Sequence, residues 1–186
     1  MIALIVLAAV AAVLLLFLVL TFNRLVRLRN EAKTGWANID VQLRRRSDLV
    51  PNLVEAVKGY AAHERETFDS VTQARAAAQQ ASGPAAAAQA DTVLGGALNR
   101  LLAVSEAYPQ LRASENFLAL QQELADIEDK LAAARRYYNQ TVYRYNTVLQ
   151  SFPAVIVARA LGFQQREFFE TEADARDAPA VSFPQP

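Results

Sequence analysis

The sequence has no cysteine and only one histidine. Without cysteine there can be no disulfide, no iron–sulfur cluster and no thiolate zinc site. A single histidine also excludes a histidine-rich metal centre. We therefore expect neither a metal site nor a cofactor.

Glycine and proline are scarce, at 6 and 7 of 186 residues. Alanine, leucine and glutamine are abundant, which is typical of long helices. No β-branched run alternates with polar residues at a period of two, so nothing indicates strands. Lysine plus arginine equals aspartate plus glutamate at 19 each, which leaves no net positive charge to attract nucleic acid. We predict an all-α protein that does not bind nucleic acid.

A long apolar run without any charge opens the chain. Residues 2–20 approach the roughly 20 apolar residues of helix that span a bilayer core about 30 Å thick. A cleaved signal peptide would begin with a basic segment and end at a small-residue cleavage site. No lysine or arginine precedes this run, and leucines continue after its one A-x-A pattern. We predict that residues 1–22 are a retained transmembrane anchor.

Basic residues follow the run directly, at Arg24, Arg27 and Arg29. Positive charges next to a membrane span favour the cytoplasmic side. We therefore expect a single-pass protein with its N-terminus outside and its body in the cytoplasm. These membrane-proximal arginines could also attract anionic headgroups, at about 1 kcal/mol per residue near the surface. The lipid bilayer is the first expected partner.

The rest of the chain has apolar residues at helical spacing and room for one domain. We predict that residues 23–150 form an antiparallel up-and-down four-helix bundle whose first helix continues the anchor without a break. Ser47 and Asp48 are expected to cap the second helix, with Pro51 in its first turn. The predicted helices cover about 23–46, 49–80, 84–108 and 115–150.

The last predicted helix has the clearest period. Its apolar and aromatic residues are spaced alternately by three and four, the a/d pattern of a coiled coil, for more than four heptads. In the third helix, Gly95 and Gly96 predict either a close approach of two helices or a local fray. The a/d positions are Phe117, Leu120, Leu124, Ile127, Leu131, Ala134, Tyr138, Thr141, Tyr145 and Val148.

After the fourth helix of such a bundle, the chain returns to the membrane end. We predict a short apolar membrane-proximal helix over residues 151–164, too short to span, and then an extended or disordered tail over 165–186. Two interpretations of the short helix stay open. It lies in the membrane interface or against a neighbouring subunit's anchor, or it closes the open end of its own bundle. The contact residues would be Val155, Ile156, Leu161 and Phe163.

Three consecutive arginines, Arg44, Arg45 and Arg46, form the densest basic patch. On a straight helix Arg45 lies about 37 Å from Leu20, far beyond a screening length of about 8–10 Å. The patch is therefore out of reach of its own membrane. It either stabilises the C-terminus of a helix or, with Arg112, meets an unidentified acidic protein partner.

Few residues could carry chemistry. His63 and Glu64 lack second and third metal ligands, so we expect a polar helix surface there. No phosphate-binding glycine loop, nucleophile elbow or Ser/His/Asp set is present, and we predict no catalytic residue and no enzyme. A di-metal bundle needs Glu-x-x-His pairs, which are missing. We expect a solvated acidic face at Glu123, Asp126, Glu128 and Asp129, paired with Lys130, Arg135 and Arg136.

A polar-aromatic band in the last helix offers an alternative function. If it lined a cavity, the chain would be a membrane-tethered enzyme or ligand sensor. Two of its tyrosines fall on a/d positions, where core packing with satisfied hydroxyls is expected instead. The band consists of Arg135, Arg136, Tyr137, Tyr138, Asn139, Tyr143, Arg144 and Tyr145.

Three segments resemble the LemA family of bacterial membrane proteins. They are residues 27–75, which begin RLRNEAKTGWANID, residues 108–163, which end VARALGF, and the later FFETEADARDAP. The alanine-rich residues 76–90 carry little of this pattern. The resemblance implies an N-terminal anchor in the bacterial inner membrane followed by an antiparallel helical bundle. It implies no activity, and relatives linked to magnetosome membranes imply a part in organising membranes.

We predict a membrane-anchored helical scaffold or interaction protein that assembles into a homo-oligomer. The oligomer is inferred from composition, because 53% hydrophobic residues exceed what an anchor and one slim bundle require.

Overall fold

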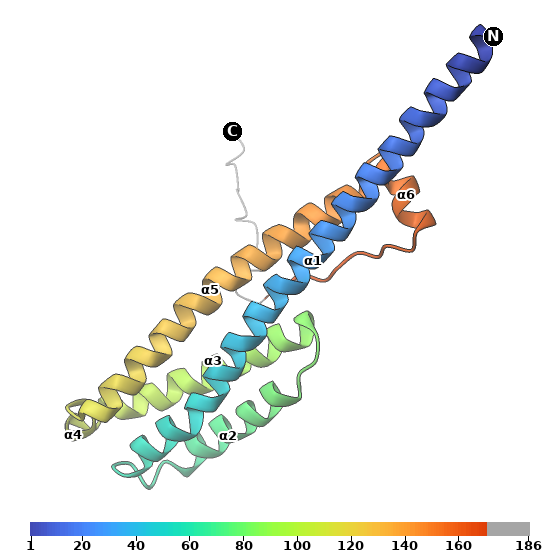
Figure 1. Cartoon of the computed structure of the whole chain (residues 1–186). Coiled ribbons are helices and arrows are strands. Elements are labelled where there is room, and N and C mark those ends of the chain that lie inside the picture. The colour runs from blue at the N-terminus through green and yellow to red at the C-terminus, as the bar shows by residue number, and fades with distance from the viewer. Residues whose placement is uncertain (171–186) are drawn as a thin grey trace, which may run out of the picture. The chain divides into compact units, whose positions relative to one another are not determined.

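The computed structural model describes residues 1–170. All regular structure in this part of the chain is helical, so the prediction of an all-α protein is confirmed. Two compact units are distinguished: residues 1–49 with 119–168, and residues 50–118 with the chain from Phe169. The helices are α1 Ile2–Lys58, α2 Arg65–Gln80, α3 Pro84–Glu106, α4 Pro109–Arg112, α5 Glu115–Gln150 and α6 Ala154–Ala160 (Figure 1).

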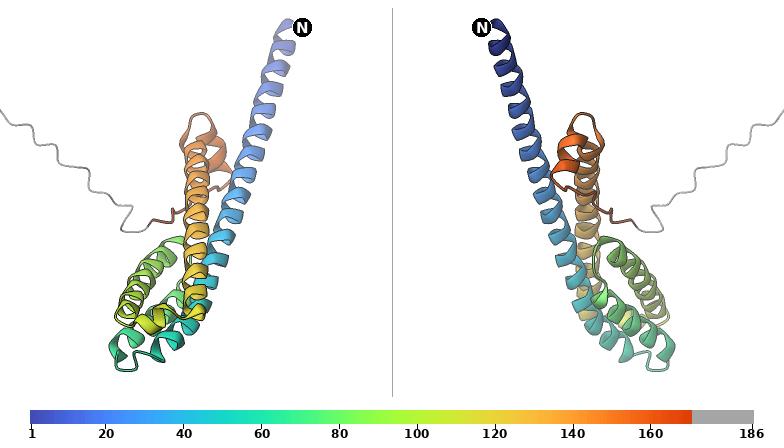
Figure 2. Two further views of the ribbon diagram at one scale, coloured as in Figure 1. Left: turned by 90° about the vertical axis from the view of Figure 1, so that its left-hand side faces the viewer. Right: turned by 90° about the vertical axis from the view of Figure 1, so that its right-hand side faces the viewer.

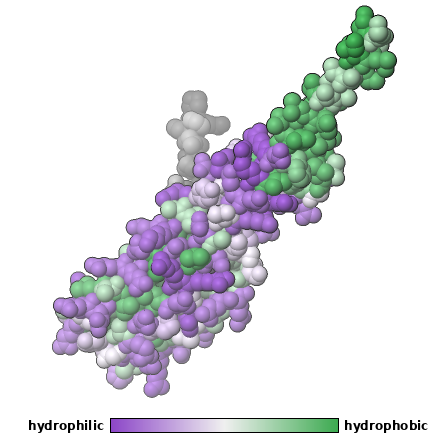
Figure 3. All heavy atoms as spheres, in the orientation of Figure 1, coloured by the Kyte–Doolittle hydropathy of each residue, from purple (hydrophilic) through white to green (hydrophobic). Residues whose placement is uncertain are grey.

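Helix α1 is a single helix of 57 residues whose first part is apolar on every side. This part carries a continuous hydrophobic surface (Figure 3), and thirteen large aliphatic side chains between Ile2 and Leu20 are exposed. At about 1.5 kcal/mol each, leaving them in water would forgo roughly 20 kcal/mol, more than the whole stability of a typical domain, about 5–15 kcal/mol. Within residues 1–170, α1 is the one helix long and apolar enough to cross a membrane.

The first turn of the chain lies later than the sequence predicts. We expected a helix boundary at Ser47 and Asp48, but α1 continues through Pro51 to Lys58. An interior proline costs about 3 kcal/mol. Buried side chains continue along this stretch at Leu49, Val50, Leu53 and Val57, and each contributes about 1.5–3 kcal/mol. Burial therefore outweighs the local proline signal, and the predicted helix over 49–80 is divided between α1 and α2.

In the first unit, α1 and α5 run antiparallel (Figure 2). Arg46 pairs with Glu128, Trp36 contacts Tyr138, and Leu28 lies in one cluster with Val148. In these three contacts the residue number decreases along α1 as it increases along α5, as it does in any antiparallel pair of helices. Eight of the ten a/d positions of α5 are buried, and Leu120 and Ala134 are half-buried, so the predicted period marks the packed face of the helix.

In the second unit, α2 and α3 pack against each other across a short turn that contains Gly83, whose φ is +83°. Helix α2 buries Phe68, Val71 and Ala74. Helix α3 stays helical through Gly95 and Gly96, and a Cβ at Gly96 would meet no atom within 4 Å. There is therefore neither a fray at these glycines nor a close approach at Gly96. The assembly of both units into one four-helix bundle stays a prediction.

Candidate membrane-proximal site

An apolar cluster joins α1, α5 and α6 directly after the apolar run. Leu25 lies about 8 Å along the helix from Leu20 and is fully buried. The chain therefore returns, after α5, to the part of α1 that follows the predicted span (Figure 2). The cluster contains Leu25, Leu28, Tyr145, Val148, Leu149 and Ala158, with Ala154 and Phe163 packed against it.

Helix α6 and the residues next to it are only partly covered by the rest of the first unit. Ala158 is buried, and the Phe163 ring that follows the helix meets Phe22 edge-on, with ring centroids 6.0 Å apart. Ile156 and Leu161, in contrast, are 61% and 48% exposed. Of the four residues expected to make the contact, Phe163 thus packs on its own α1, Val155 is half-buried, and Ile156 and Leu161 remain uncovered.

Phe152 is also uncovered and is 82% exposed. The sequence analysis did not single it out, although an aromatic residue beside Pro153 at a helix end was a visible signal. We use the name α6 outer face for the three exposed apolar side chains in and beside α6, those of Phe152, Ile156 and Leu161.

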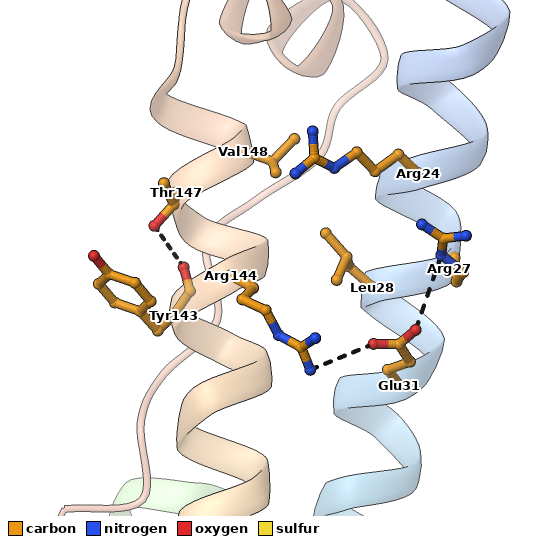
Figure 4. A pocket seen from close by; sticks show the side chains of 8 residues that line it. All are labelled: Arg24, Arg27, Leu28, Glu31, Tyr143, Arg144, Thr147 and Val148. Atoms are coloured by element: carbon orange, nitrogen blue, oxygen red, sulfur yellow. Dashed lines mark hydrogen bonds and ion pairs between the residues drawn. The ribbon is translucent and has the colours of Figure 1, made fainter.

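The three membrane-proximal arginines divide between two surfaces. Arg29 lies with its guanidinium 5.4 Å from the centre of the Phe163 ring, a cation–π contact. Arg24 and Arg27 instead line a cavity of about 380 Å³ between α1 and α5, together with Arg144 (Figure 4). The sequence placed these arginines near the membrane, but it could not assign them to opposite sides of α1.

Glu31 connects two of the cavity's arginines. Its carboxylate lies 3.9 Å from Arg27 Nε and 3.7 Å from Arg144 Nη2 (Figure 4). Among residues 1–170, no carboxylate pairs with Arg24. Sequence reasoning missed Glu31, although its i,i+4 spacing from Arg27 was a signal for an ion pair on α1.

Residues 164–170 form a non-helical segment that Asn146 holds against α5. The Asn146 side chain donates to the Arg166 carbonyl and accepts from the Arg166 amide, both at 2.9 Å. Tyr138 Oη donates to the Glu167 carbonyl at 2.8 Å. The first part of the predicted tail is therefore bound to the helix, whereas residues 171–186 lie outside the described residues.

The tyrosines of the polar-aromatic band lie on different faces of α5. Tyr138 and Tyr145 are buried, as their a/d positions predict, whereas Tyr137 and Tyr143 are exposed. Burial raises the pKa of Tyr138 and of Tyr145, and the nearby Arg166 partly opposes the shift in both. Both phenols are thus neutral at physiological pH, and the two buried tyrosines serve packing and hydrogen bonding.

At Gly35, the backbone of α1 lies very close to α5. A Cβ there would lie 3.3 Å from the Tyr138 Cα and 3.3 Å from Tyr137 Cδ1. The neighbouring Trp36 ring lies 6.0 Å from the Tyr138 ring. A close approach of two helices, one of the two outcomes expected at Gly95 and Gly96, is thus found at Gly35, which no local sequence pattern distinguishes.

The distal arginines differ in exposure and in their ion pairs, and their contact with an acidic partner stays a prediction. Arg44 is exposed and pairs with Asp40 at 2.8 Å, Arg45 is exposed, and Arg46 is buried and pairs with Glu128 of α5 at 2.5 Å. Because α1 continues to Lys58, none of them lies at a helix C-terminus, and that interpretation is wrong. Arg112 is exposed on α4.

The acidic face of α5 is only partly as expected. Lys130 pairs with Asp126 at 2.6 Å, one turn away, but Glu128 pairs with Arg46. His63 lies exposed in the turn between α1 and α2 rather than on a helix. Within residues 1–170, no group of three histidine, aspartate or glutamate side chains is placed to hold a metal ion.

Comparison of the sequence with models of protein families identifies the family of this chain. The model of the LemA family matches residues 35–183. The chain belongs to the LemA family. The match confirms the resemblance seen in the sequence. It begins at Gly35, so it includes the close approach to Tyr138 and the segment held by Asn146, and the apolar run precedes it.

Two curated relatives of this LemA-family chain come from different bacteria and carry different names. The magnetosome protein MamQ of Magnetospirillum gryphiswaldense is 27% identical over 191 residues, which cover 89% of this chain and 70% of MamQ. Protein LemA of Metamycoplasma hominis is 28% identical over 153 residues, covering 80% of this chain and 68% of that protein. Family membership and the N-terminal apolar helix together fit a membrane-associated helical protein.

Proposed function

We propose that this LemA-family chain is a self-assembling helical scaffold of the bacterial inner membrane, attached to the bilayer at two points. The first point is the apolar part of α1, and the second is the α6 outer face. The observation that carries the proposal is the position of α6, which packs against α1 directly after the apolar run and leaves apolar side chains uncovered.

The level of α6 along α1 supports contact with lipid. Phe163 touches Phe22, which lies only about 3 Å along the helix beyond Leu20. An interfacial helix buries its apolar face about 5–10 Å into the headgroup and acyl boundary. The α6 outer face, which adjoins Phe163, is therefore at the depth where a bilayer can cover it. Two attachments would fix the rotation of α1 about its axis, which a lone span leaves free.

The continuity of α1 supports a mechanical role. The helix passes without a break from the apolar run into its contacts with α5, so a tilt of the span moves the first unit with it. A scaffold that senses or imposes membrane shape requires such stiff coupling. The MamQ relatives are named as magnetosome proteins, and we propose a part in organising membranes for this chain.

Self-assembly is tested with the full chain in vesicles of phosphatidylethanolamine and phosphatidylglycerol. Imaging of the vesicles should show clusters of the protein at low surface density, and the clusters should accompany a change of vesicle curvature. The matched variant Ile156→Asp with Leu161→Asp should keep its helix content and lose the curvature change. Evenly distributed monomers at every density would contradict the scaffold proposal.

A second experiment tests whether a neighbouring subunit, rather than lipid, covers the α6 outer face. The chain has no cysteine, so Ile156→Cys gives one unique site for a short crosslinker. Efficient crosslinking of two chains through this site would show that the α6 outer face meets a second subunit. That result would overturn the lipid contact while leaving self-assembly intact.

A further inference from the structure

The cavity between α1 and α5 has the composition of an anion site. It collects Arg24, Arg27 and Arg144 around the carboxylate of Glu31, so three positive charges against one negative leave two net positive charges. Leu28 and Val148 give it an apolar part between the two helices (Figure 4). The site faces outward, because Tyr143 and Thr147 on its rim are exposed.

The arginines are not fully engaged with the protein. Charge-assisted hydrogen bonds between nitrogen and carboxylate oxygen are about 2.7–2.9 Å long, whereas Glu31 lies 3.9 Å from Arg27 and 3.7 Å from Arg144. Arg24 has no carboxylate partner among residues 1–170. Several guanidinium N–H groups are thus available, and guanidinium groups match phosphate oxygens in bidentate geometry.

The depth of the cavity indicates the source of the phosphate. Arg24 and Arg27 lie about 6 and 10 Å along α1 from Leu20. The headgroup region on each side of the hydrocarbon core is roughly 5–8 Å thick. An upright α1 therefore holds Arg24 within the headgroup layer, where lipid phosphates are concentrated, and Arg27 a few Å beyond it.

We infer that this cavity binds the phosphate of an anionic phospholipid headgroup from the leaflet through which α1 leaves the membrane. Arg24 binds the phosphate within the headgroup layer, Arg27 and Arg144 add positive charge on the outer side of that layer, and one acyl chain follows the apolar surface of α1. The inference rests on the proposed membrane attachment of α1, and it brings charges of both α1 and α5 to the headgroup.

The test uses the full chain in nanodiscs of equal parts phosphatidylglycerol and phosphatidylcholine, released gently for native mass spectrometry. The wild type should retain one phosphatidylglycerol per chain in preference to phosphatidylcholine. Arg24→Gln with Arg144→Gln should lower the ratio of bound to free chain by about thirtyfold. The control Arg159→Gln, an exposed arginine on α6 outside the cavity, should leave the ratio unchanged.

A variant of opposite sign separates binding from a failure to fold. Glu31→Gln removes the competing carboxylate and raises the net charge of the cavity, so it should increase retention of phosphatidylglycerol several-fold. Equal retention in wild type, the double variant and Glu31→Gln would overturn the inference, and so would an equal loss in the Arg159→Gln control.

Two further outcomes distinguish a lipid phosphate from free phosphate, and a failure of this inference from a failure of the proposed membrane attachment. Inorganic phosphate added to nanodiscs of phosphatidylcholine alone should not bind. Binding of inorganic phosphate as strong as that of the lipid would contradict a lipid site. A chain that fails to insert into nanodiscs would overturn both this inference and the proposed membrane attachment, whereas insertion without selective retention would overturn the inference alone.

Discussion

Gly35 shows how one residue without a side chain sets the spacing of two helices. Because Gly35 has no Cβ, the backbone of α5 can lie very close to it. A Cβ at this position would lie only 3.3 Å from the Tyr138 Cα. A backbone atom within a packed pair of helices has little freedom to give way. The contact therefore limits how closely α1 and α5 can pack. It thereby also sets the width of the arginine-lined cavity between these two helices.

We predict that Gly35→Ala destabilises the protein. Alanine gains about 1 kcal/mol of helix propensity over glycine, but overpacking a tight contact costs about 1–3 kcal/mol. The net loss should be up to about 2 kcal/mol, measured by chemical denaturation in detergent micelles. Gly96→Ala, where a Cβ meets open space, should instead stabilise by about 0.5–1 kcal/mol. Stabilisation of similar size at both sites would show that the Gly35 contact is unimportant.

Tyr138 and Tyr145 predict a loss of stability at alkaline pH. Burial raises the pKa of each phenol in the folded state, so the unfolded chain releases these protons at a lower pH than the folded one. Their contribution is complete below the ordinary tyrosine pKa of about 10 and is lost as the pH rises above it. Denaturation midpoints measured from pH 8 to 11 should fall less steeply for Tyr138→Phe than for wild type. Tyr143→Phe, at an exposed position, should retain the wild-type slope, and an unchanged slope in Tyr138→Phe would refute the argument.

Among the elements, the non-helical segment 164–170 is held to α5 by hydrogen bonds from side chains. Asn146 pairs with both backbone groups of Arg166, which is how a neighbouring strand would hold it. Tyr138 also bonds this segment, through the Glu167 carbonyl.

We expect Asn146→Ala to release this segment while α5 stays folded. Two lost hydrogen bonds of about 1 kcal/mol each should accelerate exchange of the Arg166 amide, whose hydrogen bond Asn146 accepts, by roughly ten- to thirtyfold. Hydrogen–deuterium exchange with peptide mapping measures this. Gln140→Ala, an exposed change on the same helix, is the control. Unchanged exchange in Asn146→Ala would mean that other contacts hold the segment.

The elements also show what sequence alone could predict. The period of α5 identified the buried face, including Tyr138 and Tyr145, because spacing along one helix determines which residues share a face. The end of α1 could not be found locally, since Pro51 and the pair Ser47 and Asp48 signal a boundary that burial of Leu53 and Val57 overrides. Asn146 and Gly35 escaped notice because their partners lie 20 and about 100 residues away in the chain.

Attachment of α1 and α6 to one membrane requires a single orientation of the protein. Arg24, Arg27 and Arg29 follow the span, so positive charge should keep the second unit in the cytoplasm. Ser82→Cys places a single thiol in the exposed turn between α2 and α3. A membrane-impermeant maleimide should label it only after bacterial cells are opened. Labelling in intact cells would reverse the topology and place α6 on the outer leaflet.

The central claim is that α6 contacts the same bilayer that α1 spans. The most direct test is the depth of a nitroxide attached at Ile156→Cys in the full chain, reconstituted in vesicles of phosphatidylethanolamine and phosphatidylglycerol. Oxygen partitions into lipid and a water-soluble nickel chelate does not. The account predicts that oxygen relaxes the label at position 156 more than the chelate does, and that a label at Gln140→Cys shows the reverse. A label at 156 as accessible to the chelate as the one at 140 would contradict the claim.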